Sequence, residues 1–184
     1  GTNLVAGCTP GKGGTSLMDV PVYDTMREVV KQTGAIASCI FVPPPFAADA
    51  ILEAVDAAVP LIVCMTEGLP VMDLVRVRGV LDSQETSRLI GAKCPGVIPP
   101  YPCQIGIMPG HVPKARPLGV VAQRGPLTYE ADAQPTALGI GQSTAVGLGG
   151  DPSNGTDFID GLKLFNDDPN TDGVIRTGEN GGKA

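Results

Sequence analysis

The sequence predicts an α/β fold in which parallel strands are covered by helices. Segments with strand character alternate with segments of helical periodicity along most of the chain, which is the pattern of right-handed β–α–β crossovers. Aromatic residues make up only 4% of the 184 residues and tryptophan is absent, so Val, Ile, Leu and Ala must build the core. The 25 glycines and 18 prolines are spread along the chain, which indicates many tight loops rather than one low-complexity linker.

The first half of the chain is expected to contain five strands and three helices. The expected strands are 3–8, 21–23, 36–42, 61–65 and 87–90, and the expected helices are 26–32, 46–58 and 71–81. Asp24 or Thr25 is the expected N-cap of the first helix, because both side chains accept hydrogen bonds from backbone N–H groups. In the second helix, Ile51, Leu52 and Val55 share one face, as a helix packed on a sheet requires.

The second half is expected to repeat this alternation after a break. Residues 91–117 are dense in proline and glycine, and only 104–108 within them has strand character, so this stretch is interpreted as a connection. The expected strands that follow are 118–122, 144–148 and 174–175, and the expected helices are 126–138 and 157–165. Thr156 is the expected cap of the last helix.

Charge and composition exclude several classes of function. The net charge is −6 and the pI is near 4.6, so binding of nucleic acid by a general basic surface is not expected. No apolar run reaches the roughly 18 residues that a membrane span needs. The five cysteines have no CxxC spacing and His111 is the single histidine, so reduced thiols and no metal site are expected.

Two short segments point to a ligand site, and the first of them suits an anion. TPGKGG, at residues 9–14, combines glycines that let the backbone approach a ligand with Lys12, a mobile charge suited to phosphate. TEGLP, at 66–70, is a polar turn directly after the strand expected at 61–65. Strand ends of this kind are where open α/β sheets bind ligands.

Nine segments together resemble the alpha subunit of the succinyl-CoA synthetase (succinate–CoA ligase) family, in order and spacing. They are TPGKGG (9–14), FVPPPF (41–46), TEGLP (66–70), CPGVI (94–98), IGIMPGH (105–111), LTYEA (127–131), GQST (141–144), GGDPSNGTDFID (149–160) and GENGG (178–182). The resemblance implies a Rossmann-like CoA-binding domain at 1–98, a Pro/Gly-rich connection at 99–117 and a flavodoxin-like ligase domain at 118–184. Both domains are expected to be incomplete.

The resemblance also implies a reaction and a set of CoA-binding residues. The family converts succinyl-CoA, phosphate and a nucleoside diphosphate to succinate, CoA and the triphosphate, through succinyl phosphate and a phosphohistidine. By this resemblance the CoA-binding residues are Lys12, Pro43, Met65, Thr66 and Glu67.

A second group of residues is implied at the succinate and phosphate end. Tyr129, Arg124 and Gly125 are expected to bind substrate or phosphate there, and Glu179 matches the glutamate that orients the phosphohistidine. That histidine is expected beyond residue 184, whereas His111 matches a different histidine and is assigned a structural role. The chain is therefore expected to be an internal piece of a longer subunit and to be inactive alone.

The implied partner is the beta subunit of succinate–CoA ligase, in a heterodimer or heterotetramer. The beta subunit would bring ATP or GTP with Mg²⁺, and succinate and phosphate would be the small-molecule substrates. The implied compartment is the mitochondrial matrix or the bacterial cytoplasm. Neither nucleic acid nor a membrane is an expected partner.

Some positions depart from the family pattern and leave two alternatives open. The family motif SRSGTLTYE is AQRGPLTYE at 122–130, PNCPG has Lys93 in place of asparagine, and GEIGG has Asn180. Pro126 removes a backbone donor where phosphate is expected to bind. The first alternative is a truncated, non-catalytic paralogue that acts as a scaffold on a beta subunit or another partner. The second is a related malate–CoA ligase.

Overall fold

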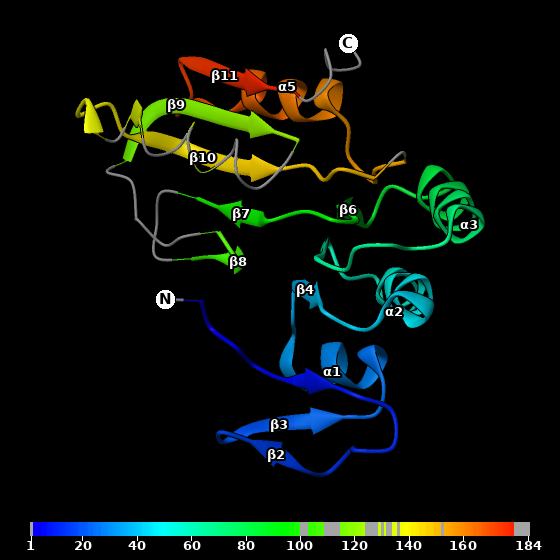
Figure 1. Ribbon diagram of the computed structural model, residues 1–184. Helices are drawn as coiled ribbons and strands as arrows, with labels where there is room; N and C mark the ends of the chain where they lie inside the picture. Colours follow the sequence, from blue (N-terminus) through cyan, green and yellow to red (C-terminus); the bar gives the residue numbers. More distant parts are fainter. Residues whose placement is uncertain are drawn as a thin grey trace.

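The chain folds as an α/β protein whose first and last elements lie at opposite ends of the molecule (Figure 1). The computed structural model describes residues 2–99, 103–108, 115–123, 129, 131, 134–135, 137–151 and 153–178. The N-terminal strands lie at one end, and β11 with α5 lies at the opposite end (Figure 1). The predicted fold class, with parallel sheets, is confirmed.

The first half forms two separate three-stranded sheets and three helices. The strands are β1 (Gly7–Cys8), β2 (Ser16–Leu17), β3 (Val20–Tyr23), β4 (Ala37–Ile40), β5 (Leu61–Cys64) and β6 (Arg88–Ile90), and the helices are α1 (Met26–Thr33), α2 (Pro44–Asp56) and α3 (Val71–Asp82). One sheet has the order β1-β3-β2 and the other has the parallel order β4-β5-β6. β2 was not predicted, and only the last two residues of the predicted strand 3–8 are paired.

Local sequence explains where the first two helices begin. Thr25 is the N-cap of α1, because its hydroxyl accepts a hydrogen bond from Glu28 N at 3.2 Å, and Gly34 ends the helix with a φ of 67°. α2 begins at Pro44, two residues before its predicted start. A proline fits there because the first helical turn has no hydrogen-bond partner for its N–H.

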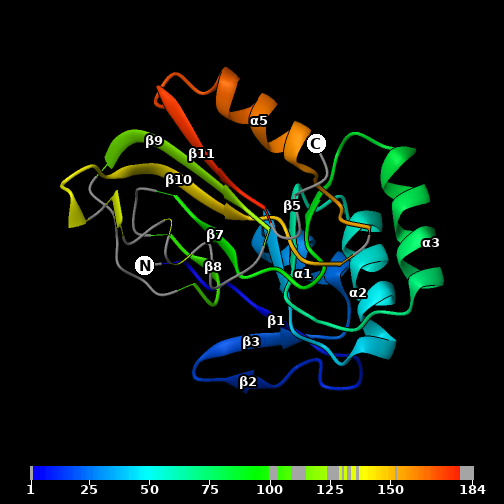
Figure 2. The same ribbon diagram turned by 45° about the horizontal axis from the view of Figure 1, so that its top comes forward.

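The largest core lies between the β4-β5-β6 sheet and its helices. Ile51 of α2, Ile62 of β5 and Val77 of α3 are at most 2% exposed and belong to one cluster. Helices α2 and α3 lie side by side at this core (Figure 2). Leucine, isoleucine, valine and alanine make up most of the cluster, as the low aromatic content predicts.

The second half is built on a five-stranded mixed sheet. Its elements are β7 (Gly96–Ile98), β8 (Ile105–Gly106), β9 (Ala115–Ala122), β10 (Gln142–Gly147), α5 (Phe158–Asp167) and β11 (Gly173–Thr177), with the sheet order β11-β9-β10-β7-β8. β9, β10 and β11 are parallel, whereas β7 runs antiparallel to β10. The prediction that 104–108 is the only strand within 91–117 is wrong, because β7 also lies there.

Sheet membership changes inside the predicted first domain. β7 lies within 1–98, yet its Ile98, Val97 and Gly96 face Ala145, Val146 and Gly147 of β10. The boundaries 1–98, 99–117 and 118–184 remain predictions. The predicted helix 126–138 lies largely outside the described residues.

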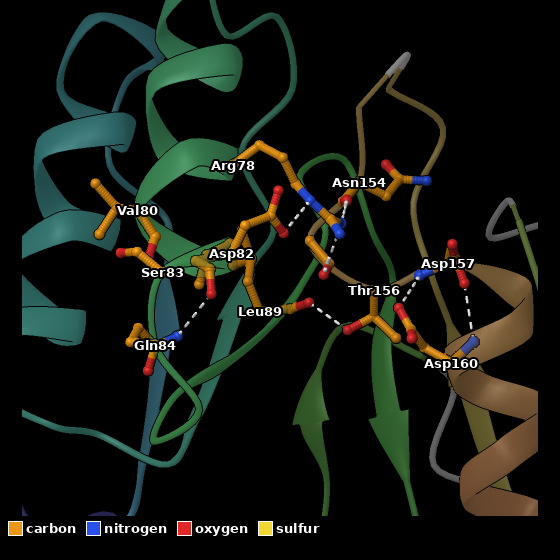
Figure 3. Close-up of polar contacts among 12 residues, drawn as sticks. Arg78, Val80, Asp82, Ser83, Gln84, Leu89, Asn154, Thr156, Asp157 and Asp160 are labelled. Atoms are coloured by element: carbon orange, nitrogen blue, oxygen red, sulfur yellow. Dashed lines mark hydrogen bonds and ion pairs between the residues drawn. The ribbon is translucent and has the colours of Figure 1, made fainter.

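The N-cap of α5 corrects the prediction for Thr156. Asp157 caps the helix instead: its Oδ1 accepts from Asp160 N at 2.8 Å, and Asp160 Oδ2 accepts from Asp157 N at 3.2 Å (Figure 3). Thr156 is 2% exposed and donates its hydroxyl hydrogen to Leu89 O at 2.6 Å. The hydroxyl is thus engaged with β6.

No helix in the described ranges has the length and apolar character that a bilayer span requires.

Candidate functional site

The TPGKGG loop is a turn braced against β3. Lys12 N donates to Thr9 O at 3.1 Å and Gly14 N donates to Val22 O at 3.0 Å. Gly13 N donates to Asp24 Oδ1 at 2.9 Å, and a Cβ at Gly13 would lie 2.4 Å from the other oxygen of that carboxylate. The Lys12 side chain is exposed. The turn therefore presents an ammonium group on a fixed backbone, which suits a phosphate.

The loops after β4 and β5 lie together at the carboxyl edge of their sheet. Thr66 Oγ1 donates to Val42 O at 2.7 Å, and Met65 N donates to Ile40 O at 3.0 Å. A Cβ on Gly68 would come within 4.0 Å of the Pro44 side chain. The predicted residues Pro43, Met65, Thr66 and Glu67 thus occupy two neighbouring loops, at the position where parallel sheets bind ligands.

Lys12 belongs to a loop of a different sheet. It follows β1, and β1 pairs with β3 rather than with β4. Within the described ranges, no hydrogen bond or ion pair connects the TPGKGG loop to residues 65–67. The predicted CoA-binding residues therefore fall into two groups, Lys12 on one loop and the rest on adjacent loops.

An acidic cavity adjoins the TPGKGG loop. It measures about 320 Å³ and is lined by Gly13, Gly14, Tyr23, Asp24, Glu28 and Gln32. It opens at the carboxyl ends of β1 and β3, beside the start of α1. A larger cavity of about 620 Å³ lies between α5 and β11, away from every described residue of the predicted CoA site.

In the second half, the carboxyl ends of three parallel strands converge. Gln123 N, after β9, donates to Thr177 O at 3.2 Å, and Gly149 N, after β10, donates to Gln123 O at 3.2 Å. The predicted residues Arg124, Gly125 and Glu179 lie outside the described residues, as does His111.

Tyr129 is the described member of the predicted succinate and phosphate group. It packs against the cluster formed by Ile98, Met108, Val120 and Ala145. Burial raises the pKa of the Tyr129 phenol above its usual value. A phenol is neutral at physiological pH even without that shift. A neutral phenol can donate a hydrogen bond to an anionic substrate.

A charged junction joins the two halves beside the loop of residues 65–67. The Lys93 ammonium forms an ion pair with Glu67, and Lys93 O accepts a hydrogen bond from Gly150 N at 3.2 Å. Burial raises the pKa of the nearby Asp151 carboxyl, the Lys93 charge lowers it and the Glu67 charge raises it. Sequence reasoning noted Lys93 as a departure but did not place it against Asp151.

Polar contacts from α3 complete this junction. Arg78 Nη1 donates to Asn154 O at 3.1 Å and lies 3.4 Å from Gly155 O, while its Nε pairs with Asp82 at 2.8 Å (Figure 3). Asn154 Nδ2 in turn donates to Gly149 O at 2.9 Å. The GGDPSNG loop was predicted as a loop, but no sequence pattern paired it with Arg78.

Two family models match the chain. A CoA binding domain matches residues 1–68, and a CoA-ligase domain matches residues 121–184. The matched ranges include the TPGKGG and TEG segments in the first domain and the carboxyl ends of β9, β10 and β11 in the second.

Curated relatives match the chain from end to end. The alpha subunit of the ADP-forming succinate–CoA ligase of Staphylococcus aureus (strain Mu50 / ATCC 700699) is 55% identical over all 184 residues, and the corresponding Staphylococcus epidermidis protein (strain ATCC 12228 / FDA PCI 1200) is 54% identical. The chain spans 61% of the length of these relatives.

Solved structures share the fold at low sequence identity. The apo dinucleotide-forming acetyl-coenzyme A synthetase 1 of Ca. Korarchaeum cryptofilum has a TM-score of 0.75 and 21% identity, over 92% of this chain and 37% of that chain. The ATP citrate lyase of Methanothrix soehngenii, in complex with citrate and coenzyme A, has a TM-score of 0.74 and 19% identity, over 85% of this chain and 27% of that chain. The chain therefore carries a CoA binding domain and a CoA-ligase domain, and over its whole length it is similar to the alpha subunits of succinate–CoA ligases.

Proposed function

We propose that this chain provides the CoA-binding part of the alpha subunit of a succinate–CoA ligase. The supporting observation is 55% identity over all 184 residues to a subunit of that name. The reaction would interconvert succinyl-CoA, phosphate and a nucleoside diphosphate with succinate, CoA and the triphosphate. Such an acid–thiol ligase would pass the phosphoryl group through a phosphohistidine.

The residues of the first half suit CoA as a ligand. The Lys12 ammonium is exposed on a turn whose glycines leave the backbone accessible, which suits a phosphate group. Pro43, Met65 and Thr66 offer a surface of low polarity for the pantetheine arm, and Glu67 adds a hydrogen-bond acceptor. Bound CoA would supply the thiol that attacks the acyl group, and the chain's own residues would orient it.

The residues of the second half are assigned to the acyl and phosphoryl end. Tyr129 would donate a hydrogen bond to succinate or phosphate, because a phenol keeps its proton at physiological pH and burial raises its pKa further. Arg124 and Gly125 would bind phosphate through charge and backbone N–H groups. Glu179 would hold the phosphohistidine in one tautomer.

A beta subunit is the proposed partner. It would bind the nucleotide with Mg²⁺, and the ADP-forming names of the relatives favour ATP over GTP. The first relatives are staphylococcal proteins, which favours the bacterial cytoplasm over the mitochondrial matrix. In the described part of the chain, no group of three or more His, Cys, Asp or Glu side chains could hold a metal ion.

Calorimetry with CoA tests this proposal. The subunit that carries these residues would be prepared in complex with its beta subunit and titrated with CoA, beside a Lys12→Ala variant. We expect binding by the wild type and about tenfold weaker binding by the variant, because one phosphate contact is lost. Absence of CoA binding by the wild-type complex would contradict the proposal.

A phosphorylation assay separates an enzyme from a scaffold. The same complex incubated with ATP and Mg²⁺ is expected to yield an acid-labile phosphoenzyme that succinate and CoA discharge. A stable complex without a phosphoenzyme would instead support a non-catalytic scaffold.

A further inference from the structure

Lys93 connects two loops that come from different halves of the molecule. Lys93 N donates to Thr66 O at 3.0 Å, and Gly150 N donates to Lys93 O at 3.2 Å. Its ammonium forms an ion pair with Glu67. One residue therefore ties the loop after β5 to the loop after β10 through both its backbone and its side chain.

The backbone conformation at position 93 is unfavourable for lysine. Lys93 has a φ of 55°, in the left-handed region where a side chain with a Cβ is strained. Asparagine, which the resembling family motif has at this position, tolerates that region better than lysine does. The lysine therefore adds a cation at the expense of local backbone stability.

The added cation acts on two carboxylates. Glu67 is its ion-pair partner, and Asp151 lies close enough for the Lys93 charge to act on it. Asp151 Oδ2 is buried and has no hydrogen-bond partner. Without the ammonium, the edge of the predicted CoA site would carry two uncompensated negative charges, one of them partly desolvated. CoA carries several phosphate charges, so that edge would repel it.

We propose that Lys93 is a positioning residue for CoA, which neutralises Glu67 and Asp151 and holds Glu67 at the edge of the CoA site. This inference rests on the proposed function, since Glu67 matters in this way only if CoA binds beside it. The ion pair is partly exposed, with side-chain exposures of 31% for Lys93 and 68% for Glu67. Pairs this exposed add little to stability, so the expected effect is on ligand affinity rather than on folding.

Calorimetry of four variants in the complex with the beta subunit tests the proposal. Lys93→Asn is expected to weaken CoA binding about fivefold at ~0.02 M salt, and less at ~0.3 M salt because salt screens the carboxylates. Lys93→Arg keeps the charge and should bind within about twofold of the wild type. Lys93→Asn with Asp151→Asn removes one carboxylate and should recover much of the lost affinity. Lys31→Asn, in the last turn of α1, makes the same change of charge elsewhere and should leave affinity unchanged.

Thermal unfolding separates this role from a structural one. Lys93→Asn is expected to unfold at the same temperature as the wild type or higher, because asparagine accommodates the positive φ. If Lys93→Asn binds CoA as tightly as the wild type at both salt concentrations, the inference is overturned while the proposed function stands. Equal losses in Lys93→Arg and Lys93→Asn would also overturn it, since charge would not be the cause. Failure of the wild type to bind CoA would instead refute the proposed function and this inference with it.

Discussion

At the scale of single residues, buried side chains with a polar or ionisable group make the stability of the fold sensitive to pH and to substitution. Cys94 is 4% exposed, and burial raises the pKa of its thiol to about 12. Its Sγ donates a hydrogen bond to Cys64 O at 3.2 Å. Thr156 is similarly enclosed, with its hydroxyl used by Leu89. Ionisation of the Cys94 thiol, or loss of the Thr156 hydroxyl, should therefore lower the free energy of unfolding.

The buried Cys94 thiol should make stability fall in alkaline solution. An unfolded thiol loses its proton near pH 9.0, whereas the folded thiol keeps it to about pH 12. The raised folded pKa therefore adds stability that is fully present below pH 9 and is lost as the pH rises toward 12. From pH 9 upward, this one group should lower the free energy of unfolding by about 1.4 kcal/mol per pH unit. Urea denaturation of the wild type and Cys94→Ala between pH 8 and 11 measures the effect, and a constant gap between the two curves would contradict it.

Loss of the Thr156 hydroxyl should destabilise the junction. Thr156→Val keeps the shape of the side chain but leaves Leu89 O without this donor, which should cost about 1–2 kcal/mol in the free energy of unfolding. Ser83→Ala removes an exposed hydroxyl that donates to Val80 O and should change that free energy by less than ~0.5 kcal/mol. Chemical denaturation gives both values. Equal changes in the free energy of unfolding for the two variants would show that burial of the hydroxyl does not determine the cost of losing it.

At the scale of elements, some glycines are required because a neighbouring group leaves no room for a Cβ, whereas others have open space around them. Gly79 lies inside α3, and a Cβ there would have no atom within 4 Å. Gly119 lies in β9, and a Cβ there would lie 2.6 Å from two ring carbons of Phe165 in α5. The packing of α5 on the sheet thus depends on a residue without a side chain at position 119.

These two glycines should respond oppositely to alanine. Gly79→Ala is expected to raise the free energy of unfolding by about 0.5–1 kcal/mol, because alanine restricts the unfolded chain and favours the helix. Gly119→Ala should lower it by about 1–3 kcal/mol, because the Phe165 ring must move. Thermal and urea unfolding of both variants decide the matter. Stabilisation by Gly119→Ala would show that α5 can shift without cost.

Most elements of the first half could be predicted because each has its own local signal. α1 has a capping threonine and a closing glycine, and β5 is an uninterrupted apolar run. β7 could not be predicted in the same way, since Gly96–Ile98 lies among prolines and is a strand because β10 pairs with it from far along the chain. The prediction that Thr156 caps α5 was wrong because Thr156 and Asp157 are both residue types that cap helices. The hydrogen bond from the Thr156 hydroxyl to Leu89 O leaves Asp157 as the cap.

The candidate site could be predicted only as separate segments. Residues 65–67 follow a clear strand, so their place at the carboxyl edge of a sheet was predictable. The juxtaposition of Lys93 with Asp151 was not, because it depends on how two loops from different halves meet. Motifs identify which loops carry chemistry, whereas packing decides which charges face one another.

At the scale of the whole molecule, the halves are joined by backbone hydrogen bonds as well as side chains. Gly91 N donates to Leu148 O at 3.0 Å, and Gly155 N donates to Gly91 O at 2.9 Å. Arg78 of α3 adds its contacts to Asn154 and Gly155. This arrangement predicts that the two halves unfold together.

Removal of Arg78 should weaken that coupling. Calorimetric unfolding of the wild type is expected to show one transition, whereas Arg78→Met should broaden it or divide it in two, because the link from α3 to the loop of 149–155 is lost. Arg76→Met is the matched control, since Arg76 pairs with Asp49 of α2 within the first half at 3.5 Å. A single sharp transition in Arg78→Met would mean that the backbone bonds alone keep the halves coupled.

The pairing of β7 with β10 also constrains how this chain could be recombined with a relative. A chimera joined in the proline-rich stretch after residue 98 would take β7 from one parent and β10 from the other. The pairs Gly96–Gly147 and Ile98–Ala145 would then join residues from two different parent proteins, whose side chains were not selected to pack together. A join between β6 and β7 keeps all five strands of the second sheet from one parent. The natural seam for exchanging modules therefore lies between Ile90 and Gly96, inside the predicted first domain of residues 1–98.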